Sequence, residues 1–329
     1  MTSIDVDLQN AVVYSIPMRS RFRGIAAREG VLIEGSHGWG EFCPFVEYDD
    51  SESVPWLQAA LEQANTDWPT SVRSRVPVNC TVPAVEAEKA RQIALASGCN
   101  TAKVKVADHP DSLSEDIARV EAVRDALGAG GAIRIDANCL WDVETAVRNI
   151  KQIDAAAGGL EYVEQPCTTV EELAAVRRQV DVMIAADESI RRADDPLKVA
   201  LAGAADVAII KPGPLGGVRR SLAVAKAAGL PCVVTSTLGT SIDVAAGVAL
   251  ASSLPELDFA CGLHTLALLT GDVVEEATSL RPSNGYIQVP TTKPVPDPRL
   301  LEDFRQKDPA RTEWWLNRLR RVSEELRGL

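Results

Sequence analysis

Five ionisable residues recur along this 329-residue chain, each near the end of a short run rich in β-branched residues. They are, in order, Lys105, Asp136, Glu164, Asp187 and Lys211. Carboxylates suit a hard divalent cation, and lysine becomes a base near neutral pH when nearby cations lower its pKa. This combination suits proton abstraction next to a carboxylate, because the cation and the second lysine stabilise the enediolate charge that develops late in the reaction.

Two simpler explanations for these five residues are surface placement and mutual ion pairing. A single acidic residue at the end of a strand is usually a helix cap or a surface group. Five such residues in register would require five separate coincidences. Ion pairing alone leaves three carboxylates against two lysines in a confined space. A divalent cation balances that charge, and we predict one Mg²⁺, for which Mn²⁺ could substitute.

The stretch AKVKV, residues 102–106, adds a second lysine to this set. Alternate residues of a β-strand point to the same face, so Lys103 and Lys105 should point the same way. Two lysines in a protein interior are costly unless they meet opposite charge. We expect both to point toward the acidic strand ends, with Lys105 nearer the chemistry and Lys103 meeting a substrate carboxylate or lowering the pKa of Lys105.

The elements that must position these residues form a regular strand–helix alternation. Each parallel strand needs a crossover connection to its neighbour, and eight such units are the number that closes a (β/α)₈-type barrel. An open doubly wound sheet is the alternative. In a barrel the carboxyl ends of the strands meet on one face, where active sites are built. The eight expected strands are 77–82, 102–106, 132–137, 160–165, 182–187, 207–212, 232–237 and 258–263.

Helical periodicity fills the intervals between these strands. Ser114 is expected to cap one helix. A second carries Val143, Val147, Ile150 and Ile153 on one face, and a third carries Val218 and Leu222 and ends near Gly229.

The two ends of the chain have a different pattern. AVVYSIPM and GIAAREGVLIEG predict antiparallel strands, SVPWLQAALEQA a helix, GYIQVP a further strand and TEWWLNRLRRVSEEL a last helix. We expect the ends to form a smaller α+β module beside the barrel. The expected division is 1–75 and 283–329 for that module and 76–282 for the barrel. Trp314 and Trp315 are expected to pack the last helix.

Composition limits the partners. A net charge of −12 argues against nucleic acid or an anionic membrane as a main partner, because both select basic surfaces. The chain has no apolar run of ~20 residues and no signal-like start, so we expect a cytoplasmic protein. Seven scattered cysteines and three histidines favour reduced thiols and an oxygen-ligated metal. The expected ligand is a small-molecule carboxylate substrate, and the sequence does not give the oligomeric state.

Five short motifs resemble the enolase superfamily, specifically its muconate-lactonizing-enzyme-like subgroup. They are the K-x-K of AKVKV, the D-x-N of IDAN, the E-Q-P of YVEQP, the D-E-S of AADES and the I-K-P of AIIKP. The resemblance covers essentially the whole chain and implies a modified (β/α)₇β barrel with an α+β capping domain made from both chain ends. It implies two catalytic lysines, Lys105 and Lys211. The implied magnesium ligands are Asp136, Glu164 and Asp187, with Asn138 and Glu188 orienting the ligands or pairing with a lysine.

Within that subgroup, three further stretches resemble the o-succinylbenzoate synthase family: PMRSRFRG followed by GWGEFCPFVEYDD, then VVTSTLGTSID, and GLHTLALLTGD. This resemblance implies Mg²⁺-dependent loss of water from a cyclohexadiene carboxylate in menaquinone biosynthesis. Arg19, Arg21 and Arg23 are then candidates to meet a substrate carboxylate. Ser236, Thr237 and Gly262 would contact the succinyl side chain.

Other functions on the same scaffold share these motifs. An N-succinylamino acid racemase or a dipeptide epimerase needs the same lysines and metal, and the three flanking stretches favour the synthase over both. Muconate cycloisomerase is a less favoured alternative. A noncatalytic barrel that serves as a binding module would make the five ionisable residues a coincidence or a vestige.

Overall fold

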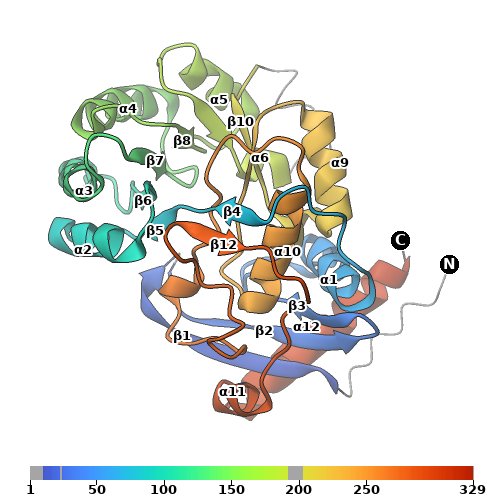
Figure 1. Ribbon diagram of the computed structural model, residues 1–329. Helices are drawn as coiled ribbons and strands as arrows, with labels where there is room; N and C mark the ends of the chain where they lie inside the picture. Colours follow the sequence, from blue (N-terminus) through green and yellow to red (C-terminus); the bar gives the residue numbers. More distant parts are fainter. Residues whose placement is uncertain (1–9, 23, 192–202, 329) are drawn as a thin grey trace.

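The computed structural model describes residues 10–22, 24–191 and 203–328. Its centre is a curled sheet of seven parallel strands whose spatial order, β5 to β11, is also their order along the chain (Figure 1). Seven of the eight predicted strands are therefore present. Their bounds are β5 Cys80–Val82, β6 Thr101–Lys105, β7 Ala132–Asp136, β8 Val163–Glu164, β9 Ile184–Ala186, β10 Val207–Ile210 and β11 Cys232–Val234.

The eighth predicted strand is reduced to two isolated bridges that join the edges of the sheet. Cys261 pairs in parallel with Val78, just before β5, and Gly262 pairs with Thr235, just after β11. The Cys261 amide donates to the Pro77 carbonyl at 2.8 Å, and the Gly262 amide donates to the Val234 carbonyl at 2.9 Å. Cys261 pairs on the β5 side of the sheet and Gly262 on the β11 side, so neither forms a continuous ladder. Together they connect the two edges and close the sheet. The predicted (β/α)₇β barrel is confirmed over the open doubly wound sheet.

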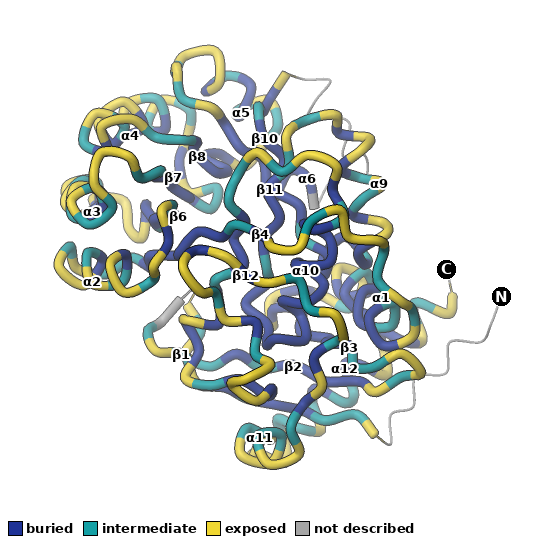
Figure 2. The backbone as a smooth tube through the Cα atoms, viewed as in Figure 1, coloured by how far each residue is buried: buried dark blue, intermediate teal, exposed yellow. Residues whose placement is uncertain are grey.

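Helices cover the outside of the sheet, and their outward faces carry the exposed residues while the strands are buried (Figure 2). The predicted faces of α4 and α9 pack against the core, and α9 ends at Gly229, whose φ of 62° is left-handed. The helices around the barrel are α2 Ala87–Ser97, α3 Leu113–Leu127, α4 Val143–Ala157, α5 Val170–Arg177, α6 Glu188–Arg191, α8 Pro212–Leu215, α9 Val218–Ala228 and α10 Ser241–Ser253.

The prediction that Ser114 caps α3 is wrong. The N-cap is Ser112, and Ser114 lies inside the first turn. Ser112 Oγ donates to the Asp116 carboxylate at 2.9 Å, and that carboxylate also accepts the Ala107 amide at 3.0 Å. These bonds join the end of β6 to the start of the helix, so α3 begins earlier than its apolar periodicity suggested.

The chain ends form the predicted antiparallel sheet and helices beside the barrel (Figure 1). Trp315 of the last helix is buried with its ring edge-to-face with that of Phe42 at 6.4 Å, which confirms a packing role. The elements of the chain ends are β1 Val12–Phe22, β2 Ile25–Gly35, β3 Gly38–Phe42, α1 Asp50–Asn65, β12 Tyr286–Gln288, α11 Pro298–Asp303 and α12 Pro309–Gly328. Two short elements lie between them in the chain: β4 Arg75–Pro77, which pairs antiparallel with β12, and η2 Leu266–Leu268.

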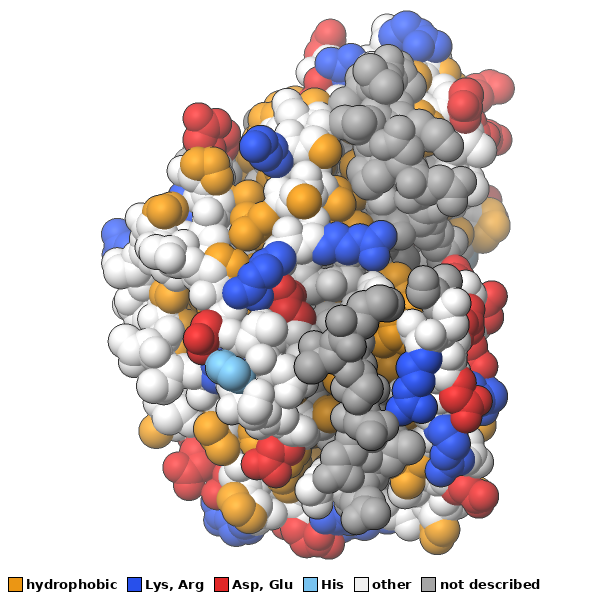
Figure 3. Space-filling model, turned by 90° about the vertical axis from the view of Figure 1, so that its right-hand side faces the viewer, with side chains coloured by type: hydrophobic (Ala, Val, Ile, Leu, Met, Phe, Trp, Pro, Cys, Tyr) orange, Lys and Arg blue, Asp and Glu red, His pale blue; other side chains and the backbone are white. Residues whose placement is uncertain are grey.

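Over the described ranges, none of the helices is long and apolar enough to cross a bilayer. On the face shown in Figure 3, the acidic and basic side chains that are described lie interspersed among apolar and neutral ones.

Candidate active site

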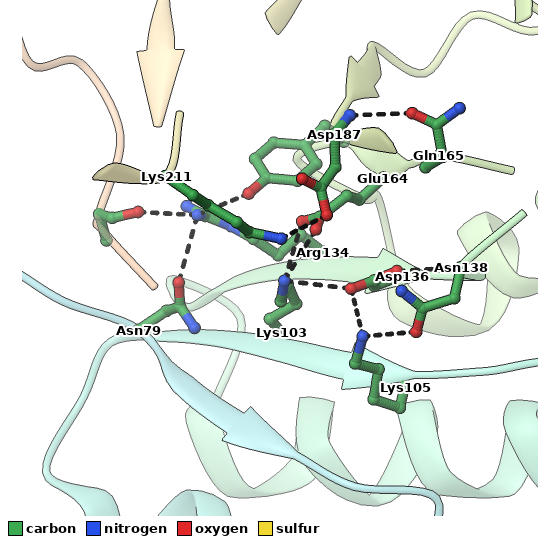
Figure 4. A network of polar contacts seen from close by, with 12 residues as sticks. Asn79, Lys103, Lys105, Arg134, Asp136, Asn138, Glu164, Gln165, Asp187 and Lys211 are labelled. Carbon is green, nitrogen blue, oxygen red and sulfur yellow. Dashed lines mark hydrogen bonds and ion pairs between the residues drawn. The ribbon is translucent and has the colours of Figure 1, made fainter. Parts of the chain in front are cut away.

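The carboxyl ends of five adjacent strands bring the predicted ionisable residues together (Figure 4). Lys105 of β6 is in register with Asp136 of β7, which is in register with Glu164 of β8. Asp187 directly follows β9, and Lys211 directly follows β10. The three carboxylates are 1 %, 0 % and 1 % exposed, so water does little to stabilise their charge.

Each of the three lysine ammonium groups contacts at least one of these carboxylates. Lys103 Nζ lies between two of them, 3.1 Å from Asp136 Oδ2 and 2.9 and 3.0 Å from the two oxygens of Glu164. Lys105 Nζ donates to Asp136 Oδ2 and, at 2.7 Å, to Asn138 Oδ1. Lys211 Nζ donates to Asp187 Oδ2. Both lysines of AKVKV therefore point inward, as predicted.

The burial of this cluster changes the pKa values of its members in different directions. Desolvation and the neighbouring Asp136 charge raise the pKa of Glu164 to about 7. Burial would also raise the pKa of Asp136, but the Lys105 and Lys103 ammonium groups hold it well below its usual value. Desolvation, reinforced by Lys103, lowers the pKa of Lys105. Burial would likewise lower the pKa of Lys103, but Glu164 and Asp136 raise it.

The carboxylates of this cluster are the candidate ligands of a divalent cation. In the described part of the chain, no three acidic, histidine or cysteine side chains are grouped closely enough to hold a metal ion as they stand. The Lys103 ammonium group lies between Asp136 and Glu164 (Figure 4). The donor chemistry nevertheless fits, since three buried carboxylates on adjacent strands are oxygen ligands for a hard cation. A cation that contacts both Asp136 and Glu164 must compete with Lys103.

The backbone turns sharply where these strands end. Ala107, Asn138 and Gln165 have φ values of 63°, 45° and 39°. These values lie in the left-handed region, which residues other than glycine adopt only uncommonly. The Gln165 side chain then joins the next strand end, because its Oε1 accepts the Asp187 amide at 2.9 Å and its Nε2 donates to Ser189 Oγ at 2.8 Å. Sequence reasoning missed this positioning role of Gln165, although the E-Q-P motif contains it.

A cleft opens onto the three lysines, Asp136 and Asn138. One wall comes from the barrel and is mostly polar. The other comes from the segment after β3 and from α1, and it is aromatic. Ser236, Thr237 and Gly262 lie in the barrel wall, where sequence reasoning placed them. The remaining lining residues are Phe45, Tyr48, Trp56, Thr81, Pro214, Thr235, Leu238 and Thr265.

The aromatic wall was not foreseen. Phe45, Tyr48 and Trp56 pack edge-to-face, with ring centroids 6.0 to 6.1 Å apart. Phe45 and Tyr48 lie in GWGEFCPFVEYDD, one of the stretches that resemble the synthase family. The resemblance pointed to this stretch but did not predict that its aromatic residues line the cleft.

The remaining predicted site residues do not line this cleft or lie outside the described residues. Glu188 is buried at the start of α6, next to Asp187 in the chain. The side chain of Arg21, at the end of β1, and all of Arg23 lie outside the described residues. Arg19 is exposed and lines a different cleft, together with Glu275 and Glu276.

The sequence matches two family models. The one described as enolase N-terminal domain-like covers residues 13–64, and the one described as enolase C-terminal domain-like covers residues 86–294. The chain is 58 % identical over 276 residues to the o-succinylbenzoate synthase of Thermobifida fusca, a match that covers 84 % of this chain and 86 % of that protein. It is 48 % identical over 318 residues to the o-succinylbenzoate synthase of Mycolicibacterium smegmatis, covering 96 % of each.

Solved structures with low sequence identity share the fold. The muconate lactonizing enzyme of Pseudomonas fluorescens superposes with a TM-score of 0.76 at 20 % identity, covering 90 % of this chain and 98 % of that one. The L-Ala-D/L-Glu epimerase of Bacillus subtilis superposes with a TM-score of 0.73 at 24 % identity, covering 87 % and 96 %. At such identities the likeness concerns the fold alone.

Proposed function

The chain belongs to the enolase superfamily and, within it, to the o-succinylbenzoate synthase family, and from this premise we propose its reaction. The protein removes water from 2-succinyl-6-hydroxy-2,4-cyclohexadiene-1-carboxylate to give o-succinylbenzoate, in menaquinone biosynthesis. The observation that carries this proposal is the 58 % identity to a synthase over 84 % of the chain. The buried lysines and carboxylates at the strand ends supply suitable chemistry.

Lys105 is the proposed base. Burial and the neighbouring Lys103 lower its pKa, so a larger fraction of its amine is neutral near pH 7. It takes the proton alpha to the ring carboxylate and returns it to the departing hydroxyl, which leaves as water. Lys211, on the other side of the carboxylates, stabilises the enediolate electrostatically as an ammonium group. The gain of an aromatic ring drives the reaction toward product.

Members of this superfamily depend on a divalent metal, and we propose one Mg²⁺ held by Asp136, Glu164 and Asp187. When bound, the cation would offset part of the negative charge that the substrate carboxylate gains during proton removal. Asn138 accepts a hydrogen bond from Lys105 and so orients the base. In the same proposal, Lys103 meets the substrate carboxylate or tunes Lys105, and Glu188 supports the ligands.

Ser236, Thr237 and Gly262 contact the succinyl group, and Arg21 meets a substrate carboxylate. The ligand is a small carboxylate, and the protein works in the cytoplasm. The capping domain comprises 1–75 and 283–329, and the barrel comprises 76–282.

The mechanism is tested by adding the cyclohexadiene substrate to purified protein in MgCl₂ or in EDTA, with Lys105→Ala beside the wild type. We expect wild-type turnover in MgCl₂, little turnover in EDTA, and a loss of at least about 10³-fold in kcat for the variant. Arg177→Met, which removes a surface ion pair with Asp206, is the control and should keep full activity. If Lys105→Ala dehydrates the substrate at the wild-type rate, Lys105 is not the base.

A further inference from the structure

Arg28 connects the two walls of the active-site cleft. It lies in β2 of the capping domain and is 2 % exposed. Its Nη2 donates to the Thr237 carbonyl of the barrel at 3.0 Å and to the Cys43 carbonyl of the capping domain. Its guanidinium carbon lies 4.6 Å from the centre of the Phe45 ring. Thr237 belongs to the barrel wall and Phe45 to the aromatic wall, so one side chain contacts both walls.

We propose that Arg28 is a positioning residue that sets the distance between the aromatic wall and the loop after β11, and thereby the fit of the substrate's succinyl side chain. This inference rests on the proposed function. Arg28 is not among the residues that line the cleft, so it would act through Phe45 and Thr237 rather than by touching substrate.

The hydroxyl and the amide of Thr237 face Asp243, whereas its carbonyl accepts the hydrogen bond from Arg28. Thr237 Oγ1 donates to both oxygens of Asp243 at 3.1 Å, and its amide lies 3.3 Å from Asp243 Oδ2. The Asp243 amide in turn donates to Glu41 Oε2 at 3.0 Å. Glu41 therefore holds the start of α10 from the capping domain. Arg28 holds the preceding loop, where that loop faces the cleft.

The C-terminal helix also holds the backbone of the aromatic wall. Nη2 of Arg318, in α12, donates to the Phe45 carbonyl at 3.0 Å and to the Tyr48 carbonyl at 2.5 Å. The segment from Phe45 to Tyr48 thus cannot easily move away from the cleft. With this wall held, the guanidinium of Arg28 acts as the spacer between it and Thr237.

The chemistry of this contact favours arginine. The planar guanidinium lies over the Phe45 ring while its Nη2 donates to both carbonyls. A lysine ammonium has N–H donors for carbonyls, but its side chain is shorter and lacks the planar face that packs on the ring. Arg28→Lys keeps the charge, removes the stacking and should let the walls shift.

The effect should appear in binding of the side chain rather than in proton transfer, because the described contacts of Arg28 do not include Lys105, Lys211 or their carboxylates. Loss of one such contact corresponds to roughly a tenfold weaker binding. We expect Arg28→Lys to raise KM about tenfold with kcat within about threefold. Inhibition by the product o-succinylbenzoate should weaken by the same factor, while inhibition by benzoate, which lacks the side chain, should be unchanged.

The matched control is Arg124→Lys. Arg124 also holds backbone carbonyls with its guanidinium, those of Gly131 at 2.6 Å and Gly128 at 2.8 Å, but on the outside of the barrel at α3. This variant should keep the wild-type KM and both inhibition constants. Should Arg28→Lys fail to fold, Arg28→Gln keeps an amide donor without a buried charge and supports the same comparison.

Three results would overturn the inference. A fall in kcat at unchanged KM would indicate only less folded enzyme. Equal weakening of product and benzoate would indicate a disturbance of the whole site, and unchanged kinetics would remove any role for Arg28. The wild type is measured in parallel, so an inactive wild type refutes the proposed function, whereas an active wild type with unaltered Arg28 variants refutes this inference alone.

Discussion

Replacing Lys103 with methionine tests the charge balance of the carboxylate cluster. Methionine has a similar length and an apolar end, so Lys103→Met removes the ammonium group and leaves little empty space. Its loss leaves Asp136 and Glu164 without the hydrogen bonds of 2.9 to 3.1 Å that Lys103 now donates. The two carboxylates stay buried, and only Asp136 keeps a second lysine partner, Lys105.

The expected cost follows from burial. The Lys103 side chain is 10 % exposed and its partner carboxylates 2 % and 0 %, so water and salt screen the pair weakly. Removing one partner of a buried ion pair costs about 3–5 kcal/mol of unfolding free energy. Glu164 can limit that cost by taking a proton, since its pKa is already about 7 with Lys103 present. The loss should therefore be largest near pH 8.5 and smaller at pH 6.

Metal binding should reverse part of this loss. At a free Mg²⁺ concentration 100 times its dissociation constant, binding to the folded state adds about 2.7 kcal/mol. In the wild type the cation must compete with Lys103 for Asp136 and Glu164, whereas in Lys103→Met it need not. Mg²⁺ should therefore stabilise the variant more than the wild type.

The assay is urea unfolding followed by tryptophan fluorescence, in EDTA and in MgCl₂, at pH 6 and pH 8.5. Arg177→Met, which breaks the exposed pair with Asp206, is the control and should cost under about 1 kcal/mol under every condition. The reasoning fails if Lys103→Met in EDTA at pH 8.5 is within about 1 kcal/mol of the wild type. It also fails if Mg²⁺ stabilises the wild type more than the variant.

Burial, with a smaller contribution from Arg281, lowers the pKa of His264 to about 4, so on acidification the unfolded chain binds the proton first. Between pH 6.5 and pH 4 this linkage should lower the free energy of unfolding by about 2–3 kcal/mol. In His264→Asn, the urea midpoint should change less with pH over this range than in the wild type. An equal change in both proteins would contradict the low pKa of His264. Trp315→Ala removes a fully buried ring and should lower the free energy of unfolding, measured in urea, by about 3–5 kcal/mol. Val295 is exposed, so Val295→Ala should lower it by under about 0.5 kcal/mol. Similar losses for the two variants would contradict the packing of α12.

The sequence predicted the barrel and the ionisable strand ends because both depend on local patterns. Strands of period two and helices of period 3.6 give the alternation, and the ends of parallel strands converge on one face. The direction of Lys103 and Lys105 followed from the same periodicity. These features need no knowledge of how distant segments pack.

The aromatic wall and Arg28 could not be predicted in the same way. Arg28 and Thr237 are 209 residues apart, and their contact depends on how the capping sheet sits against the loop after β11. The left-handed backbone of Gln165 was also missed, because glutamine gives no propensity signal for that conformation. The eighth strand was overpredicted because an apolar run indicates burial but not how many ladder bonds form.

The most direct test of the proposed function compares two reactions of the same purified protein in MgCl₂. The value of kcat/KM is measured for dehydration of the cyclohexadiene substrate and for racemisation of a panel of N-succinyl amino acids. We predict that dehydration is the faster reaction by this measure. Racemisation of any N-succinyl amino acid much faster than dehydration would contradict the synthase assignment and identify the protein as a racemase on the same scaffold.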